Sequence, residues 1–338
     1  MSQPTKLRWG ILGAARVNER LLPAIIEADN ACLVAIASRR PGAAAETLAK
    51  YAPGTSGVRC LDNLEVMLDD PDIDAIYLPM ANHEHAEWAL RAIRAGKHVL
   101  IEKPMALTVA DIDAITAEAT RYRVMVMEGF MYRFHPQHER VRKIIVSGLI
   151  GELKFVRASY SFMMRPARMY RLAQDTTQGG GAMWDIGPYA IHTLRHSLGM
   201  EPISVMAMAR YADTGADIAT SGILDFGDGK RGHFDISFEC ARRSEYEITG
   251  DKGAIKCHTV WQLPGDVPVI SWSLDDGRRG TEQLLPSNHF RLEIEGFSAA
   301  ALTGKPSLLS LDDARSNCRA INASLQSAAT GQIVRLAD

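Results

Sequence analysis

The sequence predicts an α/β protein in which a doubly wound parallel sheet is followed by an α+β domain with a large, mostly antiparallel open sheet. The length of 338 residues suits two domains of ordinary size. Up to about residue 127, short apolar runs alternate with segments of helical periodicity, which is typical of βαβ units. Beyond residue 130, alternating strands follow one another with turns between them. We therefore expect a nucleotide-binding domain at 1–128 and a substrate-binding and oligomerisation domain at 129–338.

Regular alternation of strands and helices predicts the first domain. Each expected helix can place Ala, Leu, Ile or Val on one face, as a helix packed on a sheet requires. The complete pattern is that of a Rossmann domain. The expected strands are 7–12, 33–38, 75–78, 99–101 and 124–127, and the expected helices are 17–28, 43–51, 64–68, 85–95 and 109–122.

Turn residues divide the second half into strands. Glycines at 227 and 229, and at 250 and 253, supply the positive φ angles that hairpins need. The pattern does not determine the order in which the strands pair. The expected strands are 154–162, 204–210, 218–225, 232–238 and 246–249, and the expected helices are 136–147, 183–198, 289–303 and 311–329.

Composition excludes several functional classes. The formal charge of −2 supplies no basic field for a nucleic acid, and no apolar run is long enough to span a membrane. The five cysteines lack the paired spacing of zinc or redox sites, so we expect reduced, buried thiols. The polar segment Met1–Lys6 runs directly into a strand, which predicts a cytoplasmic protein. The alternative is a periplasmic protein whose leader precedes this sequence.

A candidate phosphate-binding turn follows the first expected strand. Backbone N–H groups and the helix dipole favour a pyrophosphate at such a position. Only Gly13 fits the three-glycine pattern, because Ala15 and Asn18 occupy the other two positions. An ordinary strand-to-helix turn therefore explains the segment equally well. The candidate residues are Gly13, Ala14, Ala15, Arg16 and Val17.

Ser38, Arg39 and Arg40 end the second expected strand. NAD-binding domains usually carry an Asp or Glu here, which holds the ribose hydroxyls. Arginine instead binds phosphate in a bidentate manner, and Ser38 can donate a further hydrogen bond. The sequence therefore predicts NADP, with its 2′-phosphate at these residues. The alternative is a pair of solvated surface arginines.

Three further segments carry distinctive patterns: Pro-Met-Ala-Asn-His-Glu-His at 79–85, Ala-Gly-Lys-His-Val-Leu-Ile-Glu-Lys-Pro at 95–104, and Gly-Gly-Gly-Ala-Met-Trp-Asp-Ile-Gly-Pro-Tyr at 179–189. Together they resemble the glucose-fructose oxidoreductase and inositol dehydrogenase family, usually called Gfo/Idh/MocA, over essentially the whole chain. Glu-Lys-Pro is the most specific of these marks. Met-Glu-Gly-Phe-Met-Tyr-Arg-Phe-His-Pro at 127–136 looks like the branch holding D-xylose dehydrogenases and dimeric dihydrodiol dehydrogenases.

The resemblance implies cofactor contacts at the ends of two strands. It implies that Pro79, Asn82 and His85 line the cofactor, and Leu78, at the end of the preceding strand, is also expected to contact it. It further implies that Glu102 contacts the nicotinamide ribose. Lys103 is then expected to face both the nicotinamide and the substrate.

The resemblance also implies a substrate site in the second domain. Asp185 and Tyr189 match the family's acid followed four residues later by a tyrosine, and Arg171 matches an arginine common in this branch. The departures from the family pattern are Ala15, Asn18 and a basic loop at Arg165, Arg168 and Arg171. The expected substrate-binding residues are Arg171, Asp185, His192 and Arg133.

A proton-transfer group can be assigned on chemical grounds. Asp185, Tyr189, His192 and His196 recur at helical spacing, so a single helix could present them on one face. A tyrosine with a pKa of about 10 is too weakly acidic to act as a base near neutrality. A nearby Lys103 ammonium would lower that pKa by about 1–3 and would stabilise a developing alkoxide in the reductive direction. Hydrogen-bonded packing roles for the tyrosine and histidines are the alternative.

A metal site is not predicted. His83, Glu84 and His85, and His135 with His138, are residue types that bind zinc. No pair of histidines stands at the metalloprotease spacing with its acid, and the resemblance already gives His85 another role.

These observations predict an NADP-dependent oxidoreductase that transfers a hydride between nicotinamide and a CH–OH carbon of a sugar or polyol, of the aldose 1-dehydrogenase type. One alternative is an NADPH-dependent reductase of a diol, ketone or dicarbonyl compound. Another is a non-catalytic, cofactor-binding sugar sensor, because a fold does not fix a function. The outer face of the large sheet and the resemblance predict at least a homodimer.

Overall fold

A computed structural model describes residues 5–261 and 266–336, which form two compact units. The first unit contains the chain up to Phe134 together with Asn288–Arg315, and the second contains His135–Ser287 together with the chain from Ser316 onward. The predicted division between residues 128 and 129 therefore needs correction. Residues 129–134 and 288–315 belong to the nucleotide-binding half rather than to the second domain.

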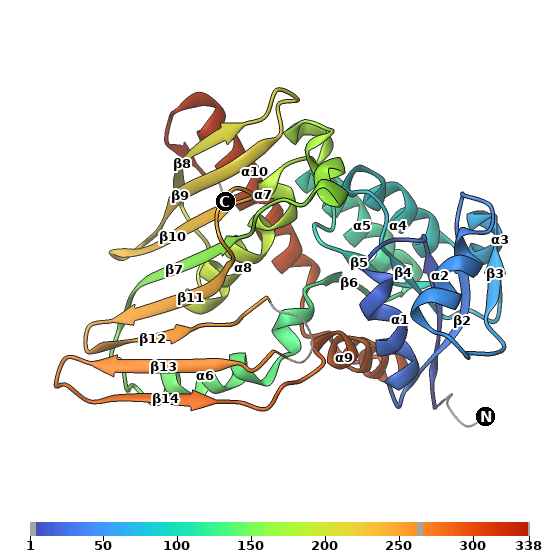
Figure 1. Ribbon diagram of the computed structural model, residues 1–338, viewed down its shortest axis with the longest axis horizontal. Helices are drawn as coiled ribbons and strands as arrows, with labels where there is room; N and C mark the ends of the chain where they lie inside the picture. The colour runs from blue at the N-terminus through green and yellow to red at the C-terminus, as the bar shows by residue number, and fades with distance from the viewer. Residues whose placement is uncertain (1–4, 262–265, 337–338) are drawn as a thin grey trace. The chain divides into compact units, whose positions relative to one another are not determined.

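The first unit is built on a six-stranded parallel sheet with the order β3-β2-β1-β4-β5-β6 (Figure 1). This order is that of a Rossmann domain, and it confirms the predicted fold class. The five expected strands are present, and a sixth, β3, is added. It has only three residues, two of them exposed, and so lacks an apolar run. The strands are β1 Leu7–Leu12, β2 Ala31–Ala37, β3 Arg59–Leu61, β4 Ala75–Leu78, β5 His98–Glu102 and β6 Val126–Gly129.

Helices cover the sheet of the first unit. The strand order reverses between β1 and β4, so right-handed connections place the helices before and after this point on opposite faces. The α5 helix begins where the Thr108 hydroxyl accepts a hydrogen bond from Asp111 N. The elements are α1 Asn18–Glu27, α2 Ala43–Tyr51, α3 Leu64–Leu68, α4 His85–Arg94, α5 Val109–Tyr122 and the short 3₁₀ turns η1 Asn82–Glu84 and η2 Met131–Phe134.

Helix α9, His289–Thr303, joins the first unit through buried contacts with β1. The buried Trp9 side chain donates from Nε1 to Ser298 Oγ at 3.1 Å, and its ring lies 5.1 Å from that of Phe297. Asn30 Nδ2 donates to the Glu295 carbonyl at 2.9 Å. The helix at 289–303 was predicted, but its sequence does not identify the element on which it packs. This is why the domain assignment of residues 288–315 needed correction.

The second unit contains a nine-stranded open sheet with the order β14-β13-β12-β11-β7-β10-β9-β8-β15. The β7–β10 pair is parallel and the other neighbouring pairs are antiparallel, which confirms a mostly antiparallel sheet. The strands are β7 Leu153–Ser161, β8 Ser204–Tyr211, β9 Asp217–Gly227, β10 Lys230–Ser237, β11 Arg243–Gly250, β12 Gly253–Cys257, β13 Val269–Leu274, β14 Arg279–Gln283 and β15 Val334–Arg335.

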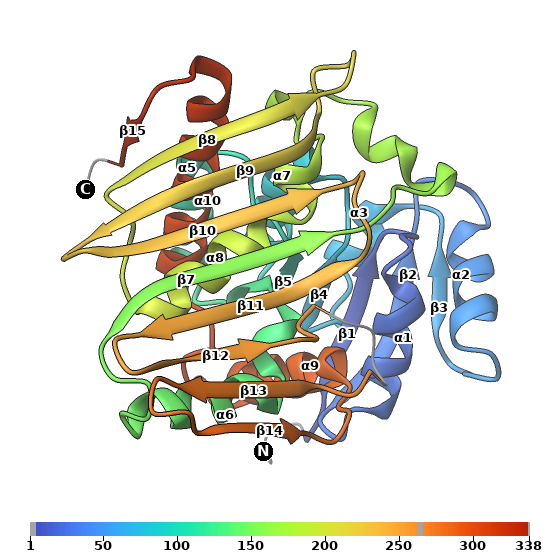
Figure 2. The same ribbon diagram turned by 60° about the vertical axis from the view of Figure 1, so that its left-hand side comes forward.

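Among the residues that the structure describes, helices cover one face of this sheet and not the other. Helix α8 packs on β7 and β10, and Figure 2 shows α8 and α10 behind the sheet with no helix in front of it. The uncovered face includes Met206, Met208 and Ile223, which are 49%, 75% and 51% exposed. The helical elements are α6 Pro136–Val146, η3 Pro166–Leu172, η4 Thr176–Gln178, α7 Ala182–Asp185, α8 Gly187–Leu198 and α10 Leu311–Thr330, whose first turns fall in the first unit.

The helix predicted at 183–198 is in fact two helices, which corrects the prediction that a single helix carries Asp185 and Tyr189. Asp185 ends α7, Ile186 has a φ of −116°, and α8 begins at Gly187. Pro188 explains the break, because it lacks the N–H that would continue the hydrogen-bond ladder and its ring crowds the preceding turn. Asp185 and Tyr189 therefore lie on successive helices.

The exposure of each cysteine depends on the element that carries it. The expectation of buried thiols is correct for Cys257 and Cys318 and wrong for the exposed Cys60 and Cys240. Cys60 is exposed because β3 is a short edge strand. None of these cysteines forms a disulfide in the structure.

Within residues 5–261 and 266–336, no helix combines the length and the apolar character needed to cross a membrane.

Candidate cofactor and catalytic sites

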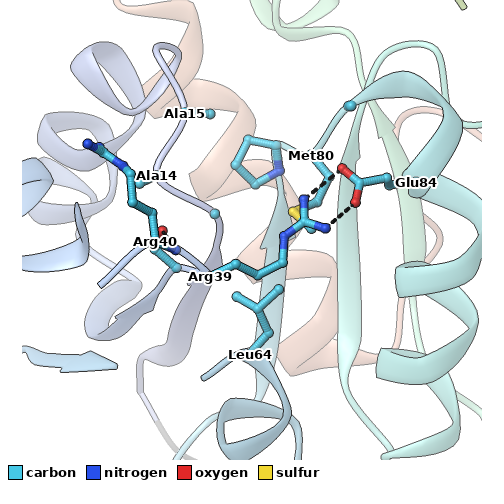
Figure 3. A pocket seen from close by; sticks show the side chains of 11 residues that line it. Ala14, Ala15, Arg39, Arg40, Leu64, Met80 and Glu84 are labelled. Atoms are coloured by element: carbon cyan, nitrogen blue, oxygen red, sulfur yellow. Dashed lines mark hydrogen bonds and ion pairs between the residues drawn. The ribbon is translucent and has the colours of Figure 1, made fainter. Parts of the chain in front are cut away.

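A pocket of about 350 Å³ lies in the first unit, at the carboxyl ends of β1, β2 and β4 (Figure 3). Doubly wound sheets bind ligands at this edge, where the strand order reverses. The glycine turn, the end of β2 and the loop after β4 contribute most of its walls. Its lining residues are Gly13, Ala14, Ala15, Ser38, Arg39, Arg40, Leu64, Pro79, Met80, Ala81 and Glu84.

The turn after β1 depends on Gly13 and Asn18. Gly13 has a φ of +143°, which favours glycine, and a Cβ there would lie 3.3 Å from Met80 Sδ. Asn18 is fully buried, and its Nδ2 donates to the Gly13 carbonyl at 2.9 Å. The departure from glycine at this position therefore has a structural role, because the amide side chain fixes the turn.

Two arginines follow β2 and take different directions (Figure 3). Arg39 forms a bidentate ion pair with Glu84, at 2.5 Å from Nη1 to Oε1 and 3.0 Å from Nη2 to Oε2. Arg40 lies 3.4 Å from Glu46, and both of these side chains are largely exposed. Ser38 is buried, and its Oγ accepts a hydrogen bond from Arg40 N at 3.2 Å.

These donors fit a phosphate ester. Two guanidinium groups, a serine hydroxyl and the backbone turn at Gly13 are the groups that bind phosphate in proteins. Glu84 is the acidic group that the sequence reasoning did not place in this pocket. Its position one residue before the expected cofactor residue His85 was the available signal.

The loop after β5 is held from both sides. His85 is fully buried, with Nδ1 2.7 Å from the Pro104 carbonyl and Nε2 3.0 Å from the Met80 carbonyl. Burial lowers the pKa of His85, and the two backbone carbonyls oppose this shift. Met105 N donates to Glu128 Oε1 at 2.8 Å. The contacts of His85 and Glu128 hold the carbonyl and the N–H of one peptide group, between Pro104 and Met105, directly after Lys103 and Pro104.

Glu102 is oriented by a buried hydroxyl. The Tyr77 side chain, which is completely buried in β4, donates to Glu102 Oε1. This bond links the ends of neighbouring strands and aims the carboxylate of Glu102. It is a second link between the loops after β4 and β5.

The structure brings together only part of the predicted cofactor set. Seven of the predicted residues line the pocket: Gly13, Ala14, Ala15, Ser38, Arg39, Arg40 and Pro79. The others lie around it in the first unit. Arg16 is exposed and Val17 half-buried before α1, Leu78 is buried in β4, Asn82 is in η1, His85 is buried, and Glu102 and Lys103 are half-buried at the end of β5.

Three of the histidines considered as metal ligands form contacts with other protein groups. His85 lies between backbone carbonyls, His135 Nδ1 accepts from Gln137 N, and His138 Nδ1 lies 3.0 Å from the Tyr246 hydroxyl. Among the described residues, no group of three or more His, Cys, Asp or Glu side chains is arranged to hold a metal ion.

In the second unit, Asp185 pairs with Arg171. Their side chains form an ion pair, and the Asp185 side chain is only 10% exposed. The pair ties the loop of η3 to the end of α7. The pair places a guanidinium beside a largely buried carboxylate, so each charge has an opposite partner.

Tyr189 packs against aromatic rings. Its ring lies 5.9 Å from that of Tyr160 and 6.2 Å from that of Trp261, and these two rings stack at 4.9 Å. Tyr189 is 7% exposed. Aromatic walls of this kind fix the ring and exclude water from its surroundings.

The remaining predicted substrate residues are less accessible or lie in the other unit. His192 is completely buried in α8 and stacks on His196 at 6.1 Å between ring centroids. Arg133 lies half-buried in η2 of the first unit. His192 is therefore inside the second unit rather than on a surface that a substrate can reach.

Asp217 anchors the glycine-rich segment that leads to Asp185. Its carboxylate accepts hydrogen bonds from Met183 N at 2.9 Å and Thr220 Oγ1 at 2.6 Å. A Cβ on Gly181 would lie 2.0 Å from Asp217 Oδ1, so only glycine permits this approach. Burial raises the pKa of Asp217 to about 6. Sequence reasoning did not identify Asp217, because its role depends on pairing between segments far apart in the chain.

Comparison with known proteins matches both halves of the chain. Residues 7–130 match the model of an oxidoreductase family with an NAD-binding Rossmann fold, and residues 138–256 match that of the GFO/IDH/MocA C-terminal domain. An NADP(+)-dependent D-xylose 1-dehydrogenase from Haloferax volcanii is 30% identical over 98% of this chain and 100% of its own length.

Two solved structures are similar over nearly the whole chain. A 3-ketoreductase from Actinomadura kijaniata, in complex with NADP and TDP-benzene, has a TM-score of 0.88 and 29% identity, covering 95% of this chain and 98% of the other. An aldose-aldose oxidoreductase from Caulobacter crescentus, complexed with glycerol, has a TM-score of 0.87 and 26% identity, covering 98% and 100%.

The raised pKa of Asp217 predicts a pH-dependent contribution to stability. A pKa higher in the folded state than the unfolded value of 3.8 gives a contribution that is complete below pH 3.8 and is lost as the pH rises through about 6. The total is about 3 kcal/mol, of which about 2 kcal/mol falls between about pH 4.5 and about pH 7.5. Relative to Asp217→Asn, the parent should lose this amount of unfolding free energy across that range, as measured by urea denaturation. A difference between the two proteins that does not change with pH would contradict the assignment.

Proposed function

The chain belongs to the Gfo/Idh/MocA family of oxidoreductases, and we propose that it transfers a hydride between NADP and a CH–OH carbon of a sugar or polyol, as an aldose 1-dehydrogenase does. The pocket at the ends of β1, β2 and β4 carries this proposal. It combines a glycine turn with Ser38, Arg39 and Arg40 in the first unit.

The cofactor assignment has two independent supports. The pocket contains the cationic and hydroxyl groups that suit a 2′-phosphate. Among its relatives, the D-xylose 1-dehydrogenase is named for NADP(+), and the ketoreductase was solved with NADP. When bound, NADP supplies the hydride acceptor, and its reduced form supplies the donor. The backbone at Gly13 and the N-terminus of α1 would hold its pyrophosphate.

Tyr189 is the proposed proton-transfer residue, and Lys103 is the proposed cation that stabilises its ionised form. The ionised Tyr189 oxygen takes the proton of the substrate hydroxyl as the hydride leaves for NADP during oxidation, and the Tyr189 hydroxyl returns that proton during reduction. Tyr160 and Trp261 hold the tyrosine ring and exclude water. The ion pair with Arg171 holds the Asp185 carboxylate at the end of α7. The proposed substrate-binding residues are Arg171, Asp185 and Arg133; His192, also expected from the sequence, is completely buried in α8 and is not included among them.

A reductase is the second candidate. The relative from Actinomadura kijaniata supports it, because that protein is a 3-ketoreductase that was solved with NADP and TDP-benzene. Both candidates use the same proton-transfer residue and differ in substrate and direction. An activity screen should therefore run NADP with aldoses and polyols, and NADPH with ketones and dicarbonyl compounds. Binding of NADPH without turnover of any compound would instead favour a sugar sensor.

The assembly proposed is a homodimer in the cytoplasm. The outer face of the nine-stranded sheet supports the dimer, because it exposes Met206, Met208 and Ile223 on neighbouring strands. Contiguous exposed apolar side chains usually mark an interface. Met206 and Ile223 are direct cross-strand partners, so the apolar surface is continuous between β8 and β9.

The first prediction from this proposal concerns cofactor choice. The parent protein should have a lower Kd for NADPH than for NADH, and Arg39→Ala should narrow the difference, because it removes a phosphate-binding guanidinium. Titration calorimetry measures both constants. Arg121→Ala, on the exposed face of α5, is the control and should leave both values unchanged. Equal affinities in the parent protein would contradict the assignment of NADP.

The second concerns Tyr189. Tyr189→Phe keeps the ring, so NADPH affinity and melting temperature should change little, whereas kcat should fall by about 10²–10⁴, the contribution of a positioned acid–base group. Tyr246→Phe is the control: it also removes a buried hydroxyl in the second unit and should keep near-parent turnover. Near-parent turnover by Tyr189→Phe would place the proton-transfer group elsewhere.

The third concerns assembly. Light scattering should give about twice the chain mass of 37.1 kDa. Met208→Glu should lower that value by placing a charge in an apolar interface, whereas Val146→Glu on α6, similarly exposed at 72%, should not. A mass near that of one chain over a concentration series would refute the dimer.

A further inference from the structure

An acidic side chain enters the nucleotide pocket from an unexpected element. NAD-binding domains usually carry their ribose-binding acid at the end of the second strand, where this chain has Ser38, Arg39 and Arg40. Glu84, at the end of η1, lines the same pocket. The absence of an acid after β2 therefore does not make the pocket free of acid.

Glu84 binds the two terminal nitrogens of Arg39, which are the atoms that a phosphate would bind. Both terminal nitrogens of Arg39 bind the two carboxylate oxygens, at 2.5 Å and 3.0 Å. Figure 3 shows the Arg39 side chain extending toward Glu84, whereas Arg40 points away. A phosphate binds arginine through the same bidentate geometry, so the carboxylate and a phosphate compete for one set of donors.

We propose that Glu84 limits the discrimination between NADP and NAD by competing with the 2′-phosphate for Arg39. The inference rests on the proposed function, since it assumes that the pocket holds the adenosine end of the cofactor. A bound 2′-phosphate must displace Glu84 from Arg39 and then lies near a carboxylate of like charge. An unphosphorylated ribose carries no such charge, and its hydroxyls can donate to Glu84.

The neighbouring groups do not remove this competition. The Glu84 side chain is 17% exposed and that of Arg39 is 60% exposed, so the carboxylate is the less solvated partner. Arg40 is paired only loosely with Glu46 on the exposed surface of α2. Arg40 and Ser38 can still bind the phosphate, which preserves a preference for NADP while Glu84 reduces it.

The ion pair between Arg39 and Glu84 contributes little to the stability of the fold. A variant without it should therefore change ligand affinity without unfolding the protein. Partly exposed ion pairs add little to stability. The position of η1 depends instead on its contacts with α4 and on backbone hydrogen bonds such as that from Glu84 N to the Ala81 carbonyl at 2.8 Å. Glu84→Gln keeps the size of the side chain and removes its charge. We expect its melting temperature to stay close to that of the parent protein.

The test compares two ligands that differ only in the 2′-phosphate. Titration calorimetry should measure the Kd of 2′,5′-ADP and of 5′-AMP for the parent, Glu84→Gln, Glu84→Asp and Glu46→Gln. In Glu84→Gln the preference for 2′,5′-ADP over 5′-AMP should rise about tenfold, because a competing like charge has been removed. Glu84→Asp, which keeps the charge, and Glu46→Gln, which alters the other arginine's partner, should stay within about threefold of the parent.

The possible results distinguish a failure of the role proposed for Glu84 from a failure of the proposed nucleotide-binding function. If the parent binds both ligands and the preference in Glu84→Gln is unchanged or falls, Glu84 positions Arg39 or is neutral, and the inference is overturned while the proposed function stands. If Glu84→Asp changes the preference as strongly as Glu84→Gln, the shape of the side chain rather than its charge is responsible, which also overturns it. If the parent binds neither ligand, the pocket is not a nucleotide site and both proposals fail.

Discussion

The reversal of strand order between β1 and β4 determines most of the first unit. Because the six strands are parallel, their carboxyl ends meet at one edge of the sheet. Helices that cover opposite faces diverge at the reversal and leave a crevice there. The turn at Gly13, the arginines after β2 and the loop with Pro79 are brought together by this topology alone. The buried contacts of Asn18, Tyr77 and His85 then fix the loops at that edge.

The second unit positions its polar groups by a different means. Here a buried carboxylate, Asp217 on β9, holds the N-terminus of α7, and glycine at 181 allows the two backbones to approach. The break at Pro188 then redirects the chain, so that Asp185 faces Arg171 while Tyr189 faces the rings of Tyr160 and Trp261. The aromatic cluster and the ion pair thus flank a single bend. Precise placement of Tyr189 and Asp185 follows from packing around this bend rather than from the spacing of one helix.

Local patterns predicted the elements of the first unit better than those of the second. The bounds of β1, β4, α2, α3, α5 and α9 agree with those expected from the sequence. Five strands were not predicted: β3 and β15, which have three and two residues, and β12, β13 and β14, which have five, six and five. The role of Glu84 was hidden for another reason, since it depends on where η1 lies relative to β2. Sequence spacing likewise could not show that Trp9 meets Ser298, 289 residues away.

The return of Asn288–Arg315 to the first unit has a consequence for dissecting or recombining the chain. The backbone passes from one unit to the other three times, after Phe134, Ser287 and Arg315. A fragment ending at Phe134 would leave Trp9 without the Ser298 hydroxyl and the Phe297 ring that cover it. The nucleotide-binding half is therefore not a contiguous cassette. A chimaera that exchanges cofactor specificity with a relative should transfer the segment up to Phe134 and the segment Asn288–Arg315 together. The packed pair of β1 and α9 then comes from the same parent protein.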